Sequence, residues 1–216
     1  PLDLFRNQVF AASGLLALAG GMIVYAMIFY LPLFIQRVLG QTATTSGASL
    51  APLFIPVAVS AVLGGQLIAK MGRYQFLAVI GAIILLAGMF LLTRMNTTTT
   101  LTMVSLNMIV IGLGIGVLQP IYTLAAQNAI PIQRMGTGTG AVNYLRAMGS
   151  LIGTAVLGAI VTHPGSGAHT SRQALAVSIE QIFVVTLGVG IAILIITFFL
   201  KDVRLRKRGE GVSHEH

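Results

Sequence analysis

Polar side chains recur at helical spacing in the apolar segment around residue 150. Asn143, Arg146, Ser150 and Thr154 are three or four residues apart, so on a helix they share one face. Arginine stays charged at physiological pH, and a charge in an apolar layer requires a polar or anionic partner. Arg146 is therefore suited to point into a polar cleft, where it would hold a gate closed against a carboxylate or contact a substrate.

Arg146 also has a simpler interpretation, which depends on its depth in this segment. It lies 17 residues before His163, which is about 25 Å along a helix. In a hydrocarbon layer of about 30 Å, this distance leaves Arg146 about 5 Å from one edge. Its stem would then reach the lipid headgroups, and the residue would have no other role. The sequence leaves both interpretations open.

Other groups with acid–base or metal-binding chemistry lie away from the apolar segments. The carboxylates stand at the ends of the chain or in expected loops: Asp3, Glu180, Asp202, Glu210 and Glu215. The histidines stand in one loop and in the tail, where solvated positions are expected: His163, His169, His214 and His216. The chain has no cysteine, which excludes disulfides and thiolate metal sites. We expect no metal, no cofactor and no enzymatic activity, because no acid–histidine cluster or nucleophile motif occurs.

The other apolar segments carry aromatic and amide side chains that suit the binding of a small molecule. The rings would offer surface to flat apolar or cationic compounds, and the amides would offer adaptable hydrogen bonds. Packing between helices accounts for the aromatic residues equally well, and Phe29 suits a lipid-facing position too. The candidate substrate-binding residues are Tyr25, Phe29, Tyr30, Asn107, Gln119 and Asn143.

Membrane-crossing helices must hold these residues in place. Long uncharged stretches separate the basic residues, and each holds at least the roughly 20 residues that a helix needs to cross a bilayer. The stretches are continuous and do not alternate apolar with polar residues, which excludes barrel strands. We predict six transmembrane helices, at about 9–35, 46–69, 76–93, 102–123, 139–162 and 181–200.

The composition agrees with a membrane protein. Hydrophobic residues make up 56% of the 216 residues and charged residues 8%, against about 25% charged residues in a soluble domain. The net charge of +8 comes from short clusters that flank the apolar stretches, so it does not indicate a nucleic-acid partner. The chain starts at Pro1 without a signal-peptide pattern. We interpret it as part of a longer protein.

The basic residues are distributed unevenly between the two sides of the predicted bundle. An even number of spans places both termini on one side of the membrane. If both are cytoplasmic, ten basic residues lie inside and three lie outside (Arg37, Arg94 and Arg172), as the positive-inside rule requires. We therefore divide the chain into a six-span bundle, residues 1–200, and a basic cytoplasmic tail, residues 201–216.

Polar residues are sorted among the six predicted spans. The first, second, fourth and fifth spans contain them, whereas the third and sixth contain almost none. An unpaired polar group in hydrocarbon is costly, so we expect four helices around a polar cleft and two helices against lipid. The order polar, polar, apolar occurs twice, as in the three-plus-three inverted repeats of secondary transporters. Glycines four apart, in "GLGIG" and "GSLIG", would allow helices to pack closely.

Two stretches of the chain resemble a known family. They are "IFYLPLFIQRVLGQTATTSGASLAPLFIP" and "LQPIYTLAAQNAIPIQRMGTGTGAVNYLRAMGSLIGTAVLGAIV". Both are similar to the second half of fourteen-span drug:proton antiporters of the major facilitator superfamily, in the EmrB/QacA-type branch. In the second stretch, Asn143, Arg146, Gly149 and Gly153 fit that branch. The resemblance covers essentially the whole chain and implies an all-α membrane protein, half of a major facilitator fold.

The resemblance also implies a function. The chain would be the C-terminal half of a proton-coupled multidrug efflux transporter that works by alternating access in the bacterial cytoplasmic membrane. Its partners would be an amphipathic or cationic drug-like substrate, protons, the lipid bilayer and the missing N-terminal half. The implied gating or coupling residues are Arg146, Ser150, Gln127 and Asn128. The loop "GGQLIAKMGRYQ" has Ala69 where the family has an acid, so we do not assign this loop the family's gating role. The best-known acidic residues of the family belong mostly to the first half, so the resemblance implies that the coupling acid lies in the missing half.

Two alternatives stay open at this point. The same fold would serve to export an endogenous lipid or a siderophore-like metabolite. A membrane scaffold subunit that transports nothing would also account for six helices without a coupling residue.

Overall fold

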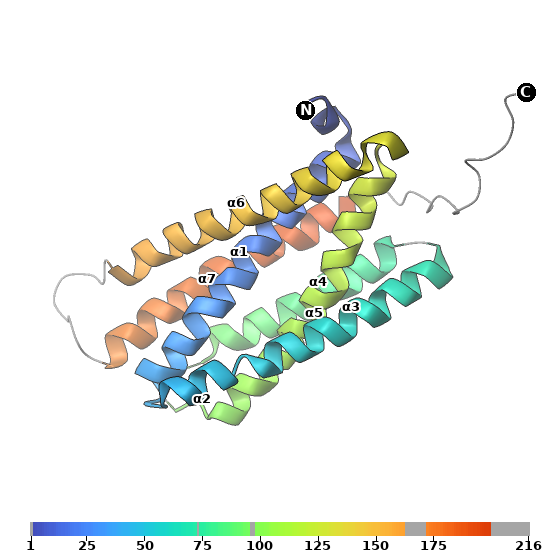
Figure 1. The fold of residues 1–216 in the computed structure, drawn as a ribbon. Coiled ribbons are helices and arrows are strands. Elements are labelled where there is room, and N and C mark those ends of the chain that lie inside the picture. The colour runs from blue at the N-terminus through green and yellow to red at the C-terminus, as the bar shows by residue number, and fades with distance from the viewer. Residues whose placement is uncertain (1, 73, 96–97, 163–171, 200–216) are drawn as a thin grey trace, which may run out of the picture.

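The computed structural model describes residues 2–72, 74–95, 98–162 and 172–199. Within these ranges every regular element is a helix, as the sequence predicts. Six long helices lie side by side, and shorter helices join or precede them (Figure 1). The elements are η1 (Leu2–Arg6), α1 (Gln8–Arg37), α2 (Ala43–Ala48), α3 (Ala51–Met71), α4 (Gln75–Thr93), α5 (Leu101–Asn128), η2 (Ile132–Arg134), α6 (Met135–Thr162) and α7 (Arg172–Phe199).

Local sequence sets several of the helix ends. Asn7 caps α1, because its Oδ1 accepts a hydrogen bond from the backbone N–H of Val9 at 2.9 Å. The side chains of Thr42 and Thr100 cap α2 and α5 in the same way. A side-chain oxygen before the first turn satisfies a backbone donor that has no partner within the helix. At the other end of α3, Gly72 has φ 66°, a left-handed conformation that favours glycine.

The helices differ in length from the predicted spans. The second predicted span includes residues 46–50, but α3 begins at Ala51 because the short helix capped by Thr42 precedes it. α5 continues to Asn128, α6 begins at Met135, and α7 begins at Arg172. Counting uncharged residues locates the part of a helix that crosses hydrocarbon. Helical hydrogen bonding continues beyond that part, so the helices are longer.

The long helices form two layers. α6 packs along α1, α1 packs along α5, and α5 packs along α3, so these four make one layer in that order. α4 and α7 make the second layer, where they contact each other and pack against α5 and α1. Figure 1 shows α6 beside α1 and α3 beside α5. The four helices of the first layer are those with polar residues in the sequence, and the second layer holds the two apolar helices.

The packing repeats after three long helices. If α1, α3 and α4 are exchanged for α5, α6 and α7, the α3–α5 contact becomes the α6–α1 contact. The α4–α5 contact likewise becomes the α7–α1 contact. α1 and α5 run in opposite directions, so the two triplets are inverted relative to each other (Figure 1). This is the three-plus-three arrangement that the sequence predicts.

Glycines allow the closest helix contacts, as their spacing predicts. Between α3 and α5, a Cβ atom on Gly112 would overlap the carbonyl oxygen of Leu53. Between α6 and α1, a Cβ atom on Gly149 would overlap the carbonyl oxygen of Leu18. These backbones touch only because the two glycines have no side chain. The two helix pairs are related by the repeat, and each pair contains a backbone contact that a glycine makes possible.

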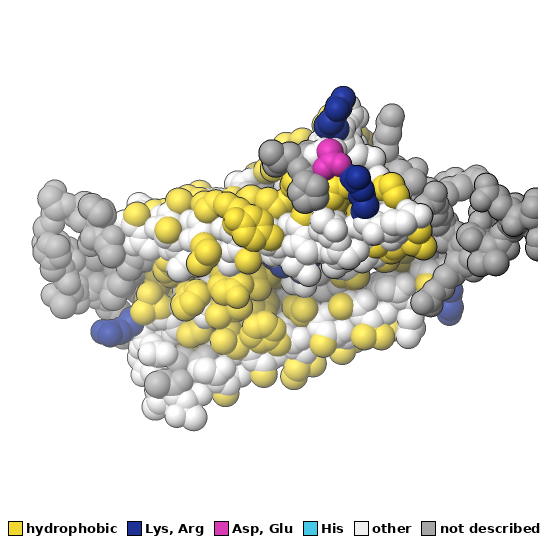
Figure 2. Space-filling model, turned by 45° about the horizontal axis from the view of Figure 1, so that its top comes forward, with side chains coloured by type: hydrophobic (Ala, Val, Ile, Leu, Met, Phe, Trp, Pro, Cys, Tyr) yellow, Lys and Arg dark blue, Asp and Glu magenta, His cyan; other side chains and the backbone are white. Residues whose placement is uncertain are grey.

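Among the described residues, five helices are long and apolar enough to cross a membrane: α1, α3, α4, α5 and Val177–Phe199 within α7. α6 is 28 residues long and carries the polar stripe, and it is not among the five. It nevertheless packs along α1, one of the five. On the face shown in Figure 2, the basic and acidic side chains lie mostly toward the ends of the bundle, with hydrophobic side chains between them.

Candidate functional site

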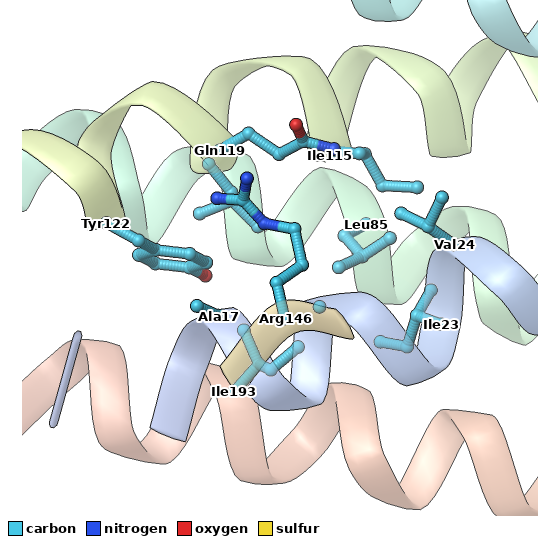
Figure 3. A pocket seen from close by; sticks show the side chains of 11 residues that line it. Ala17, Ile23, Val24, Leu85, Ile115, Gln119, Tyr122, Arg146 and Ile193 are labelled. Atoms are coloured by element: carbon cyan, nitrogen blue, oxygen red, sulfur yellow. The ribbon is translucent and has the colours of Figure 1, made fainter. Parts of the chain in front are cut away.

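A pocket opens beside the middle of α1, between helices of both triplets. It holds about 350 Å³ of space free of protein atoms, including the part open to the outside. The enclosed cavity volume is only about 20 Å³, well below the roughly 300–1,000 Å³ of small-molecule sites, but the lining has the composition of such sites, mostly apolar with a few polar groups. Here the polar side chains come from Gln119, Tyr122 and Arg146 (Figure 3). The other lining residues are Ala17, Gly20, Ile23, Val24, Leu85, Ile115, Leu118 and Ile193.

The second layer of helices also contributes to this pocket. Leu85 of α4 and Ile193 of α7 both line it. The sequence expects these two helices to face lipid, because they contain almost no polar residue. Their contribution to the pocket is apolar, and both helices also keep exposed apolar side chains, among them Phe90 and Ile195. One face of each helix therefore reaches the pocket, and another face stays open for contact with lipid.

Arg146 lies deep in the bundle and not at its edge. α6 begins at Met135, so Arg146 is about 16 Å from the start of its helix. Its half-buried side chain points toward the part of α5 that carries Gln119 and Tyr122 (Figure 3). Of the two interpretations that the sequence leaves open, this geometry favours the side chain directed into the bundle over the one that reaches the headgroups.

The guanidinium of Arg146 is only partly satisfied. Its Nη1 donates a hydrogen bond to Oδ1 of Asn143 at 3.1 Å. Its Nη2 is buried and has no hydrogen-bond partner among the described residues. The hydroxyl of Tyr122 is also buried without a partner there, close to Thr197 of α7 but outside hydrogen-bond geometry. Two groups that can donate hydrogen bonds thus line one pocket without an acceptor, and such buried groups are uncommon.

Close backbone contacts hold Arg146 at this position. A Cβ atom on Gly21 of α1 would overlap the carbonyl oxygen of Arg146. One turn further along α6, Gly149 makes the close contact with Leu18. Because the two backbones touch at Arg146 itself and again one turn later, Arg146 has little freedom to move along α1.

The three aromatic candidates on α1 lie outside the pocket, in two different places. Tyr25 and Phe29 are exposed to 42% and 53%, and their ring centroids are 6.3 Å apart. Tyr30 is buried, and its hydroxyl donates to the carbonyl oxygen of Thr154 of α6 at 3.5 Å. The structure therefore leaves Tyr25 and Phe29 free to contact another molecule and places Tyr30 in the packing between α1 and α6.

The three amide candidates are not brought together either. Gln119 lines the pocket, and Asn143 is joined to it through its hydrogen bond with Arg146. Asn107 is half-buried on α5, twelve residues before Gln119, which is about 18 Å along the helix. Asn107 is therefore too far away to contribute to this pocket.

The remaining predicted gating residues lie at other contacts. The Oγ of Ser150 donates to the carbonyl oxygen of Ala147 in its own helix at 2.6 Å. The Nε2 of Gln127 donates to Oγ1 of Thr139 at 2.9 Å, which links the end of α5 to the first turns of α6. The Nδ2 of Asn128 is buried and has no partner among the described residues.

The start of the chain is tied to the connection between α5 and α6. Arg134 in η2 forms an ion pair with Asp3 in η1. The hydrogen bond from Arg134 holds the pKa of the Asp3 carboxyl below its usual value of 3.8. The Nδ2 of Asn7 also donates to the carbonyl oxygen of Ala129 at 2.9 Å. These contacts join three segments at the end of the bundle where the chain begins.

The sequence profile of the Major Facilitator Superfamily matches residues 2–154. The chain belongs to the Major Facilitator Superfamily. The matched part contains α1 to α5 and most of α6, and therefore every lining residue of the pocket except Ile193.

Relatives of this major facilitator chain include named transporters. The multidrug transporter protein MdtP of Bacillus subtilis is 30% identical over 162 residues, which cover 74% of this chain and 30% of MdtP. A tetracycline resistance determinant of Streptomyces rimosus is 30% identical over 157 residues, covering 73% of this chain and 45% of that protein. An uncharacterized MFS-type transporter of Mycobacterium tuberculosis is 26% identical over an alignment of 234 residues, which covers 95% of this chain and 34% of that protein. The chain thus spans less than half the length of these relatives.

Sequence reasoning missed part of the pocket of this major facilitator chain. Gln119 was selected for its amide group, and Tyr122, three residues later, lies near it on the same helix face, so helical spacing would have added Tyr122. Leu85 and Ile193 carry no such signal, because an apolar residue in an apolar helix gives no indication of what it faces. Only the packing of α4 and α7 against α5 and α1 brings these two to the pocket.

Proposed function

We propose that this chain is the C-terminal half of a multidrug efflux transporter of the EmrB/QacA-type branch. The observation that carries the proposal is the pocket, which receives side chains from both inverted triplets of a major facilitator chain. The printed names of two relatives, a multidrug transporter and a tetracycline resistance determinant, support an amphipathic drug-like substrate. The class of transported compound and the place of this half in the full protein are both part of the proposal.

The proposed mechanism is alternating access. The bundle of residues 1–200 moves against a second bundle, and the pocket is exposed first to one side of the membrane and then to the other. Gln119 and Arg146 supply hydrogen bonds in the pocket. The exposed pair of Tyr25 and Phe29 supplies aromatic surface for a substrate on its way to or from the pocket.

Proton coupling is assigned to the part of the protein outside this chain. Among the described residues the carboxylates belong to Asp3 in η1 and Glu180 near the start of α7. Neither lines the pocket. Intramembrane acids or histidines usually carry the protons in such transporters, so the acid belongs to the N-terminal half. His163, His169 and the basic tail (201–216) lie outside the described residues.

The proposed location is the cytoplasmic membrane of a bacterium, with both ends of the chain in the cytoplasm. The connection between α3 and α4 and the connection between α5 and α6 then face the cytoplasm together with the start of the chain. Lys70 and Arg134 lie there, in agreement with the positive-inside rule.

The complete gene provides the test of this function. It is expressed in a host without its own drug exporters, and accumulation of a fluorescent amphipathic dye is measured with and without a protonophore. We expect lower accumulation than in the empty-vector control, and equal accumulation once the protonophore removes the gradient. Equal accumulation without the protonophore, for every compound of a panel that covers cations, neutral compounds and anions, would contradict efflux. Reduced accumulation that persists with the protonophore would contradict proton coupling but not efflux.

A further inference from the structure

The charge of Arg146 has no counter-ion in the described part of the chain. Its one hydrogen-bond partner there is the neutral amide of Asn143, and its Nη2 has none. Asp3, one of the two described carboxylates, is paired with Arg134, and Glu180 is exposed near the start of α7. A neutral acceptor satisfies one N–H group but cannot neutralise the charge. The site therefore lacks an acceptor that is also negative.

The donors of the pocket match the shape of one kind of anion. Arginine presents its N–H groups in a planar fork, which binds the two oxygens of a carboxylate better than it binds a single acceptor. The hydroxyl of the buried residue Tyr122 lies near Thr197 without a hydrogen bond of good geometry, and it supplies a further donor. Gln119 completes the polar part of the lining. No lining side chain is acidic, so the pocket offers a cation no counter-charge.

The rest of the pocket suits an apolar group attached to that anion. Ile23, Val24, Leu85 and Ile115 line it, and Figure 3 shows their side chains on one side of Arg146, with Tyr122 on the other. Because the enclosed volume is about 20 Å³, an apolar chain that leaves the carboxylate would run past these side chains toward the open side of the pocket, and the part in contact with them would be removed from water. Polar and apolar parts of the pocket are thus separated along its length.

We propose that this pocket recognises the carboxylate of an amphipathic organic anion. The carboxylate lies between Arg146 and Tyr122, and the apolar part lies against Val24, Leu85 and Ile115. The inference rests on the proposed function as a transporter and narrows its substrate class, because a positively charged head group is repelled at this position. Cationic compounds would have to bind elsewhere, for example at the exposed pair of Tyr25 and Phe29.

Equilibrium binding to the purified full-length protein tests this inference without a proton gradient. The probes are dodecanoate and dodecyltrimethylammonium, which share an apolar chain and differ in the charge of the head. We expect Arg146→Gln to weaken dodecanoate binding at least about tenfold and Tyr122→Phe about threefold, since charged hydrogen bonds contribute more than neutral ones. Arg146→Lys should fall between wild type and Arg146→Gln, because lysine keeps the charge without the fork.

The control is Arg37→Gln, which removes the same charge at the far end of α1, outside the pocket. It should bind both probes as wild type does, and thermal unfolding in detergent confirms that each variant is folded. Unchanged dodecanoate affinity in Arg146→Gln would overturn the inference. So would an equal loss of both probes, because Arg146 would then pair with a carboxylate of the protein itself.

The outcome is separable from that of the efflux assay. If dodecanoate binds in an Arg146-dependent manner and no compound is exported, the proposed function fails and the inference stands. If dyes are exported and dodecanoate does not bind to wild type, the inference fails and the proposed function stands.

Discussion

At the scale of single residues, side chains of the same type differ in their burial, which the sequence does not indicate. Tyr25 and Tyr30 are both tyrosines of α1, five residues apart, and both are candidates for contact with a substrate. Five residues are about 1.4 turns of a helix, so the two side chains leave α1 in different directions. Tyr25 is exposed beside Phe29, whereas Tyr30 is buried against α6 and hydrogen-bonded to Thr154.

This difference predicts different effects of the same substitution in the full-length protein. Tyr25→Ala should keep wild-type abundance and change the relative resistance to cationic compounds, because only an exposed ring is removed. Tyr30→Ala should lower the unfolding temperature and the abundance of the protein, since a cavity replaces a buried ring at a cost of about 3 kcal/mol. Immunoblots of membranes and growth inhibition by a drug panel give the two measurements. Equal loss of abundance in both variants would contradict the assignment of Tyr25 to the surface and Tyr30 to the packed interior.

At the scale of helices, glycines decide how close α6 comes to α1. Gly149 touches the backbone of Leu18, whereas a Cβ atom on Gly140, nine residues earlier on α6, would meet nothing within 4 Å. Two glycines of one helix thus have opposite roles. One is required for packing, and the other has an unfilled space beside it.

These two glycines form a matched pair for mutation. Gly149→Ala should destabilise the bundle by about 1–3 kcal/mol, because the methyl group overlaps backbone that cannot move without separating the helices. Gly140→Ala should be neutral or stabilise by up to about 1 kcal/mol through its higher helix propensity. The midpoints of thermal unfolding in detergent measure both effects. If the two midpoints shift in the same direction by the same amount, the contact of Gly149 is not what holds α6 on α1.

The contact between η1 and η2 should depend on pH. The folded pKa of Asp3 is lowered from 3.8 by the hydrogen bond from Arg134. A lowered pKa means that the contact contributes stability above the unfolded value of 3.8 and loses it as the pH falls through the folded value. Because both side chains are more than half exposed, the loss of stability at low pH is confined to this contact.

A spin label at Gln133, next to Arg134, reports this contact. In the wild type we expect restricted motion of the label at pH 7 and greater motion once the pH has fallen well below 3.8, through the lowered pKa of Asp3. Asp3→Asn should show the greater motion at both pH values. A label that is equally restricted in the variant at pH 7 would show that the ion pair does not hold these segments together.

At the scale of the whole molecule, the inverted triplets explain why the pocket lies in the middle of the bundle. The second helix of each triplet packs on the first helix of the other, so α1 and α5 are central and receive α6 and α3. A pocket beside α1 and α5 therefore draws residues from both triplets. The arrangement places Arg146 of one triplet beside Ile23 and Val24 of the other.

The proposed orientation is tested by cysteine labelling, since this chain contains no cysteine. In the full-length protein without other cysteines, Thr44→Cys in α2 should react with a membrane-impermeant maleimide in intact cells. Gln133→Cys in η2 should react only after the membrane is permeabilised. The two residues lie at opposite ends of the bundle and are both exposed. The reverse pattern would show that the orientation in the membrane is opposite to the one proposed. Equal labelling of both residues in intact cells would contradict a bundle that spans the membrane.

The sequence by itself determined the helices, the sorting of polar residues onto α1, α3, α5 and α6, the repeat and the family. Hydropathy, helical spacing and glycine spacing are local properties, so they can be read along the chain. Only the tertiary structure decided the depth of Arg146, the part that Leu85 and Ile193 take in the pocket, and the separation of Tyr25 from Tyr30. These depend on which helix faces lie against each other, and a packed interface is formed by residues that are distant in the sequence.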